Sequence, residues 1–570
     1  MLGEGRLRTI AGTDDAGGGP GAFTRRTAAL RPLLTAPPGS VWRDPVTWTV
    51  AVLVFGAYFV ISLFRLLQLT PGSYDLGIYT EYVKQLSQLH APVVDILAPG
   101  FNLLGNHFQV AVGVIAPFFR LFPSPATLLF FQALFAAVSV FPVAAAATAL
   151  AGRSAGRLIG FAYGFSWGLQ QMIDFDFHEI ALAVPLFAFS VSALVRRRPV
   201  AAIAWALPLV FVEESQGFTV AAIGLLLGAS AAFPSLLPPP VAQSAPAPLS
   251  AQPGRPGWPA RLRSRLPARF GRRLLTGGWW DDGHVALWGG FFLVAWGLFW
   301  STFAITVIIP HFNPDHEYYF WTDGGTIGGG KGFSVGALLG QTARGWPTKL
   351  QTVVLLLLPT AFAALGSPVV LLALPSLALR FISTDTAFWG TDFHYNATVM
   401  PILFIAAADG IRRWRRASAL AWPEGVSGRS RPVRDVARAA RSGIARHGAA
   451  MMAAVAVALA FQFPLSGLWR SSTYELNAHV AAADAAMAVV PNGATVQTTL
   501  DLLAPLAART DTFWIGNAGN PATQYIVFDG ENSGYYPAIA NVPQFIAKLY
   551  PSDGYVQVFE RGDVYVFRRS

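Results

Sequence analysis

Long blocks of apolar residues dominate the pattern of hydrophobic and polar positions along the chain. Ala51–Leu63, Leu128–Leu150 and Val285–Ile309 are examples. Apolar blocks of about 18 residues or more are long enough to cross the roughly 30 Å hydrocarbon core of a bilayer as helices. The pattern therefore predicts a mainly α-helical protein, built as a polytopic transmembrane bundle.

Arginine clusters lie between these blocks and give the predicted direction of each span. Such clusters occur at Arg196–Arg198, Arg412–Arg416 and Arg431–Arg446. Cytoplasmic loops of membrane proteins carry an excess of Lys and Arg. Alternating the sides accordingly predicts about eleven spans in the cell membrane, with the N-terminus in the cytoplasm and the C-terminus outside. Three of these spans are expected at 158–173, 348–365 and 369–381.

Two apolar segments fit this alternation only if neither crosses as a single helix. Phe108–Phe122 is short and is interrupted by a proline and an arginine, which predicts a juxtamembrane helix on the outer side. Val200–Ser230 contains Glu213 and Glu214, and two carboxylates in mid-bilayer would be costly. We expect this segment to form two short helices that meet near an outer cavity.

The remaining segments divide the chain into five predicted parts. Short strands alternate with helices after residue 470, and Val556–Glu560 with Val564–Arg568 is typical of a β-hairpin. A helix is also expected at Thr473–Val490. The five parts are a disordered cytoplasmic tail (1–44), an N-terminal membrane module (45–232) with a first outer loop (67–125), a disordered basic cytoplasmic loop (233–283), C-terminal membrane helices (284–470) and a small extracytoplasmic α/β domain (471–570).

Composition agrees with a membrane protein, and it argues against a soluble domain, a nucleic-acid-binding protein and cysteine chemistry. Only 13% of the residues are charged, against about 25% in soluble domains. The net charge is +10, but the basic residues separate apolar blocks instead of covering one folded surface, so nucleic acid is not an expected partner. The chain contains no Cys, which excludes disulfide and thiolate chemistry.

The ionisable residues near the predicted spans fall almost entirely on the outer side, where they are candidates for function. Asp75 follows the first span, and its carboxylate can act as a general base or can cap the next helix. Asp176 and His178 fit either a divalent-metal pair or a polar loop that caps two helices. No metal site is assigned from the sequence, which leaves open whether a divalent cation binds.

Other outer residues also allow two interpretations each. Glu213 and Glu214 can hold a sugar hydroxyl or can simply break a helix. Arg380 can bind a lipid phosphate or can extend to the interface. The candidate substrate-binding residues are His107, Asp176, His178, Glu213, Glu214, Arg380, His394 and Tyr395.

Several short motifs, in their order and spacing, resemble an uncharacterised bacterial family of polytopic membrane proteins. That family is a domain of unknown function grouped with the GT-C glycosyltransferases. The resemblance covers about residues 66–409, and the outer tail more weakly. Its motifs are Tyr74–Ile78, Gly105–Phe108, Ala116–Pro123, Gln132, Asp176–His178, Glu213–Glu214 and His394–Tyr395.

The resemblance implies a GT-C fold, with juxtamembrane helices in the first outer loop and an outward-facing cavity. It implies a polyprenyl-phosphate-linked sugar as donor, an envelope glycan, lipid or protein as acceptor, and Asp75 as catalytic base of an inverting transfer. Many GT-C enzymes carry two adjacent acids at this position, whereas Leu76 follows Asp75 here, which puts a metal-dependent mechanism in doubt. The alternatives are a transporter or flippase of a lipid-linked or polar substrate, and a non-catalytic envelope-assembly protein.

Overall fold

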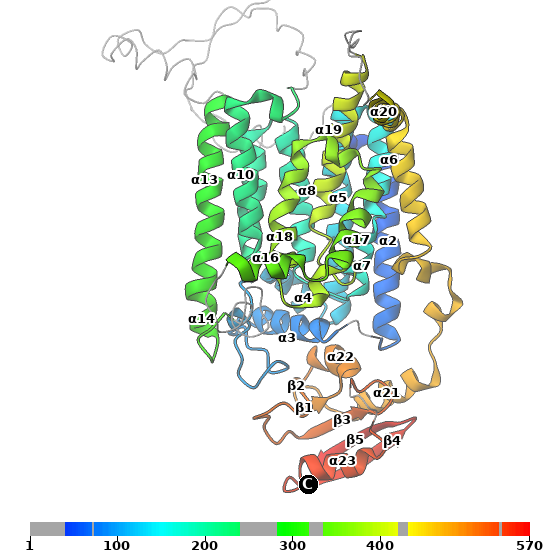
Figure 1. The fold of residues 1–570 in the computed structure, drawn as a ribbon. Helices are drawn as coiled ribbons and strands as arrows, with labels where there is room; N and C mark the ends of the chain where they lie inside the picture. The colour runs from blue at the N-terminus through cyan, green and yellow to red at the C-terminus, as the bar shows by residue number, and fades with distance from the viewer. Residues whose placement is uncertain (1–39, 71–72, 240–281, 319–334, 420–430, 535–538) are drawn as a thin grey trace, which may run out of the picture.

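The computed structural model describes residues 40–570, apart from 71–72, 240–281, 319–334, 420–430 and 535–538. Within these residues, helices run side by side in a bundle, and a small sheet domain lies at one end (Figure 1). The tail predicted at 1–44 and the loop predicted at 233–283 lie largely outside the described residues.

The N-terminal half of the bundle is packed around α5, which contacts α2, α6 and α8. Tyr58 of α2 is fully buried, and its hydroxyl donates to the carbonyl of Gly164 at 2.7 Å. The helices of this half are α2 (Pro45–Leu67), α5 (Pro125–Ala151), α6 (Arg153–Gly164), α7 (Trp167–Asp174), α8 (Ile180–Val195), α9 (Pro199–Ala206) and α10 (Gln216–Ala232).

The second half is joined to the first mainly through the pair α10 and α13. Glycines let these two backbones approach closely, because a Cβ added at Gly297 would lie 2.2 Å from the carbonyl oxygen of Gly217. The helices of this half are α13 (Asp282–Phe303), α14 (Ile309–Phe312), α16 (Val335–Ala343), α17 (Trp346–Leu357), α18 (Leu374–Ile382), α19 (Val399–Ala419) and α20 (Arg431–Ala460).

Among the described residues, four helical segments are long and apolar enough to cross a membrane, judged by length and composition. They are Pro45–Leu67, Pro125–Ala151, Gly283–Phe312 and Val436–Ala460. Five shorter apolar segments accompany them, among them 199–211 and 216–232 on either side of Glu213 and Glu214. The count of eleven spans and their direction remain predictions.

Three expected continuous spans are broken in the structure. The segment expected to cross at 158–173 divides into α6 and α7 at Phe165–Ser166. The spans expected at 348–365 and 369–381 are replaced by α17, three 3₁₀ turns and α18. Ala361 and Phe362 adopt positive φ angles of 48° and 58°, and prolines at 359, 368 and 375 prevent a continuous helix there.

Basic side chains gather at the end of the bundle opposite the sheet domain. Arg157 binds Asp44 at 2.6 Å, and Arg412 and Arg413 both bind the buried Asp409 at 2.7 Å. Arg415 donates to the carbonyls of Ala151 and Ala445, so this arginine of α19 joins the end of α5 to the middle of α20. This grouping suits a cytoplasmic face.

The loop predicted to be the first outer loop lies at the other end. Its helix α3 (Asp75–Ser87) runs across the end of the bundle (Figure 1). The segment predicted as a juxtamembrane helix forms a 3₁₀ turn (Val110–Ile115) and the short helix α4 (Ala116–Leu121).

The C-terminal domain contains a five-stranded sheet in the order β2-β1-β3-β5-β4. Strands β2, β1 and β3 are parallel, whereas β3, β5 and β4 pair antiparallel. The predicted hairpin forms β4 and β5, but β2 was not predicted. The elements are α21 (Ala478–Val489), β1 (Thr495–Thr498), α22 (Leu503–Ala507), β2 (Asp511–Trp514), β3 (Tyr525–Asp529), α23 (Val542–Leu549), β4 (Tyr555–Arg561) and β5 (Val564–Arg569).

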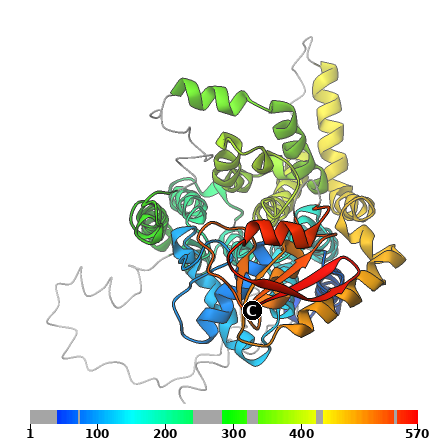
Figure 2. The same cartoon turned by 90° about the horizontal axis from the view of Figure 1, so that it is seen from below.

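Helix α21 begins later than the predicted Thr473, because Asn477 caps it: its Oδ1 accepts from the Val480 amide at 2.9 Å. The C-terminal domain lies over the end of the bundle that carries α3 (Figure 2). Its helix α22 packs against α3. A Cβ added at Gly77 of α3 would lie 2.9 Å from Cβ of Leu503. Close packing therefore fixes the helix that begins with Asp75 against this domain.

Candidate active site

A cavity of about 410 Å³ opens beside α3, where the first outer loop meets the bundle. Its walls come from α3, from the loop before α8, from the break between α9 and α10, and from the segment between α18 and α19. Its ionisable lining residues are Tyr74, Asp75, Tyr79, His107, His178, Glu179, Glu213, Tyr318, Arg380, His394 and Tyr395.

Asp75 is the first residue of α3, and its carboxylate is half-buried in the cavity wall. No side-chain hydrogen bond caps this helix, so the alternative role of Asp75 as a cap is not realised. Burial raises the pKa of Asp75, an effect that nearby His178 partly offsets and Glu179 reinforces. A carboxylate with a raised pKa is a stronger base than an exposed one.

Glu179, Tyr79 and His178 form a buried polar group beside Asp75. The Tyr79 hydroxyl donates to Glu179 Oε2 and also lies 2.8 Å from Gln109 Oε1. His178 Nδ1 lies 2.7 Å from the same Glu179 oxygen. Glu179 is 1% exposed, so its charge acts on this group through little water.

Glu214 does not line the cavity but holds the loop that does. Its Oε1 lies 2.8 Å from His107 Nδ1 and accepts from the Tyr318 hydroxyl at 2.9 Å. Its Oε2 accepts from the Phe108 amide at 2.9 Å. Burial by itself lowers the pKa of His107, because it disfavours the charged imidazole. The Glu214 carboxylate has the opposite effect and is the main reason that the pKa of His107 is raised to about 9.

His107, Glu213 and Glu214 offer ligand atoms that lie within 4.8 Å of one another, a geometry a divalent cation could use. Both Glu214 oxygens already accept hydrogen bonds, which leaves Glu213 with the more available carboxylate. Asp176 and His178, the pair considered from the sequence, line different hollows.

Arg380 is a buried cation in the wall of the cavity, 7% exposed. Its guanidinium donates to the carbonyls of Phe388, Gly390 and Tyr395 and to Asn396 Oδ1, at 2.8–3.2 Å. All four acceptors are neutral, and within the described residues no ion pair involves Arg380. The cavity therefore contains a positive charge available to an anion.

Two histidine rings also line the cavity. His178 and His394 stack with their centroids 3.5 Å apart and their planes 17° apart. His394 is 5% exposed, and its Nδ1 has no hydrogen-bond partner. Its neighbour Tyr395 lies 4.2 Å away, centroid to centroid, and also faces the cavity.

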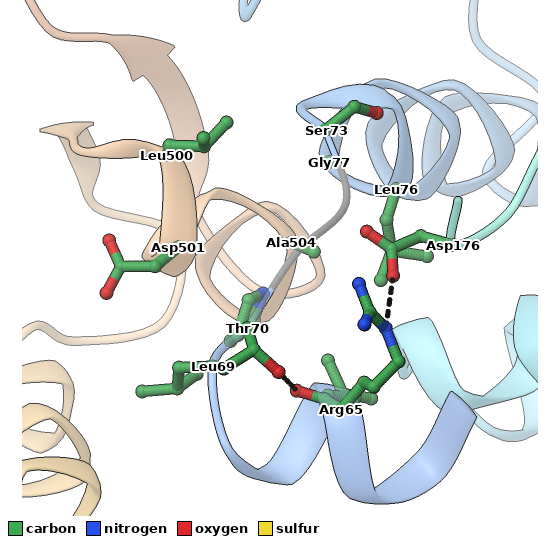
Figure 3. Close-up of a pocket in the computed structure, with 12 residues that line it drawn as sticks. Arg65, Leu69, Thr70, Ser73, Leu76, Gly77, Asp176, Leu500, Asp501 and Ala504 are labelled. Carbon is green, nitrogen blue, oxygen red and sulfur yellow. Dashed lines mark hydrogen bonds and ion pairs between the residues drawn. The ribbon is translucent and has the colours of Figure 1, made fainter. Parts of the chain in front are cut away.

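Asp176 corrects the sequence prediction, because it lies outside the cavity. Its backbone has a φ of 77°, and its carboxylate lies 3.7 Å from Arg65 Nε (Figure 3). This left-handed turn directs Asp176 into a separate hollow of about 20 Å³ against the C-terminal domain. The ion pair with Arg65 gives Asp176 a structural role.

The other predicted residues converge on the cavity, with Glu214 directly behind its wall. Sequence reasoning did not select Tyr79, Gln109, Tyr318 or Asn396, and it counted Glu179 among the outer ionisable residues without giving it a role. Tyr79 follows Asp75 by four residues and so shares its helix face, which is a usable signal. Glu179 is adjacent to His178 and Asn396 is adjacent to Tyr395, whereas Tyr318 reaches the site only through the tertiary fold.

A comparison with protein families decides the family. The family described as "Predicted membrane protein (DUF2079)" matches residues 65–536. The chain belongs to this family. A comparison with curated proteins gives no match.

Several solved structures are similar in fold to this DUF2079 member. ArnT from Cupriavidus metallidurans bound to undecaprenyl phosphate is 13% identical, with a TM-score of 0.47, over 93% of this chain and 98% of that one. The Archaeoglobus fulgidus oligosaccharyltransferase tethered to an acceptor peptide is 12% identical, with a TM-score of 0.37, over 93% and 74% respectively.

Proposed function

We propose that the protein is an inverting membrane glycosyltransferase. It transfers a sugar from a polyprenyl-phosphate donor to an envelope glycan, lipid or protein acceptor on the outer face of the cell membrane. The observation that carries the proposal is one cavity with a carboxylate of raised pKa, Asp75, and an uncompensated buried cation, Arg380. Such a transfer needs a base for the acceptor and a positive charge for the departing phosphate.

Asp75 acts on the acceptor. Its carboxylate takes the proton of an acceptor hydroxyl, whose oxygen attacks the anomeric carbon of the sugar. The bond from that carbon to the phosphate oxygen breaks, the configuration inverts, and the lipid phosphate leaves with the electron pair. A base is most effective when its pKa lies near the operating pH, which the burial of Asp75 favours.

Arg380 acts on the donor. Charge develops on the phosphate as the sugar departs, and a fixed cation in the cavity wall stabilises that charge. The neutral carbonyls around the guanidinium hold it in place without neutralising it. The stacked His178 and His394 rings add a flat surface to the cavity wall, against which a sugar ring can pack.

Ligand-induced thermal stabilisation of the purified full-length protein tests the proposal. One lipid-linked sugar in a panel of polyprenyl-phosphate sugars should stabilise it beyond bare polyprenyl phosphate, by about 2.7 kcal/mol at ~100 times its Kd. Arg380→Met should weaken that binding about tenfold or more, because a charge-assisted contact is lost. The exposed Arg344 gives a matched control, Arg344→Met.

No response across the panel, together with transport of another substrate in proteoliposomes, would favour a transporter instead. Equal binding by Arg380→Met and Arg344→Met would remove Arg380 from the donor site.

A further inference from the structure

A second polar cluster lies in the C-terminal domain, at the carboxyl ends of its parallel strands. Asp501 follows β1, and Asp529 is the last residue of β3. Strand β1 lies between β2 and β3, so the chain leaves it toward one side and later returns on the other. Ligands of open α/β sheets bind at this switch point, beyond the carboxyl ends of the strands.

Three side chains meet there. His479 of α21 places Nε2 2.7 Å from Asp529 Oδ2, and the ligand atoms of His479, Asp501 and Asp529 all lie within 4.8 Å of one another. Asp529 is fully buried and Asp501 is 3% exposed. Glu531 adds a third carboxylate, 3.1 Å from His479 Nδ1.

One oxygen of Asp501 has no hydrogen-bond donor beside it among the described residues. Its Oδ1 accepts from the Thr499 hydroxyl at 3.0 Å, whereas Oδ2 is buried and accepts from none of the described donors. Asp529 differs, because its Oδ1 accepts from the amides of Glu531 and Asn532. A buried carboxylate oxygen without a donor is costly unless a cation meets it.

The surroundings supply more negative than positive charge. A Cβ added at Gly530 would lie 2.3 Å from Asp563 Oδ2, which places a further carboxylate beside the cluster. A single imidazole therefore faces several carboxylates. Figure 3 shows the Asp501 side chain directed away from Arg65, so that arginine does not compensate it.

We propose that His479, Asp501 and Asp529 bind a divalent transition-metal cation such as Mn²⁺ or Zn²⁺. An imidazole with two carboxylates is a donor set that suits these ions. His479 contributes Nε2, and Asp501 contributes Oδ2. The ion ties α21 to the ends of β1 and β3, next to α22, which packs on α3.

Metal analysis of the full-length protein tests this site. The protein is treated with EDTA, titrated with Mn²⁺ or Zn²⁺, and followed by metal content after gel filtration and by thermal unfolding. The wild type should retain about one equivalent per chain and become more heat-stable. Asp501→Asn and His479→Gln should each lose at least tenfold in affinity and most of the stabilisation.

Two controls separate this site from others. Asp484 is exposed on the same helix as His479, so Asp484→Asn should bind as the wild type does. Glu213→Gln alters the cluster beside the cavity and should leave this equivalent in place. Retention of no metal, or equal binding by Asp501→Asn and Asp484→Asn, would overturn the proposal, and the carboxylates would then share a proton instead.

Discussion

Lys84 offers the sharpest test of how the C-terminal domain is held on the helix that carries Asp75. Its side chain is 8% exposed, and its ammonium donates to the carbonyl of Thr510 at 2.6 Å. The Asp511 carboxylate lies 3.8 Å away but is 58% exposed, so it adds little. One charge-assisted hydrogen bond thus joins α3 to the start of β2.

Lys84→Met retains most of the apolar stem and removes the donor. The loss should cost about 1.5–3 kcal/mol, the contribution of a hydrogen bond made by a charged group. If this free energy is lost from the packing of the C-terminal domain on α3, the population in which the domain is separated from α3 rises by a factor of about 10 to 150. Hydrogen exchange of the β1 and β2 amides, measured at pH 7, should accelerate by a similar factor.

Lys548→Met is the matched control, because Lys548 is exposed on α23 of the same domain. It should leave exchange at β1 and β2 unchanged. Unchanged exchange in Lys84→Met, or equal acceleration in both variants, would refute the idea that Lys84 docks the domain.

Two further predictions concern buried carboxylates. Burial raises the pKa of Glu81 to about 8 from an ordinary 4.5, so ionisation should cost the folded state stability as pH rises from 4.5 to 8. Glu81→Gln cannot ionise, so its stability relative to the wild type should rise across that window and reach an advantage of a few kcal/mol above pH 8. Thermal unfolding of both proteins, measured as a function of pH, checks this. Stability curves of the variant and the wild type that run parallel over this pH range would contradict it. Glu214→Gln should lower the free energy of unfolding by about 2–4 kcal/mol, because an amide cannot accept from His107, Tyr318 and the Phe108 amide together. The exposed Glu317→Gln should have no such effect, and equal losses would argue against a special role for Glu214.

The sequence predicted the parts of the fold that depend on composition along the chain. Apolar blocks located the long helices, and the Asp-Leu-Gly segment located the start of α3. The breaks between α17 and α18 were missed. The segment between these helices is apolar enough for a continuous helix, and its sequence does not indicate that Ala361 and Phe362 adopt left-handed backbone angles. Strand β2 (Asp511–Trp514) was also missed.

The residue types that form the site were predictable from the sequence, but the direction in which each side chain points was not. Asp176 and His178 are two residues apart, yet the backbone turn at Asp176 directs it to Arg65 and leaves His178 in the cavity. The carbonyls around Arg380 come from a loop without a periodic pattern. Such contacts depend on tertiary packing, which local sequence does not encode.

The central claim is that Asp75 is the base of a sugar transfer from a lipid carrier. Its most direct test is release of polyprenyl phosphate from the stabilising donor, in proteoliposomes supplied with envelope extract as acceptor. The wild type should release it, with a rate that rises with pH through the raised pKa of Asp75. Asp75→Asn should still bind the donor yet lose at least a hundredfold in rate, as expected when a general base is removed. Release by Asp75→Asn at the wild-type rate would contradict the account.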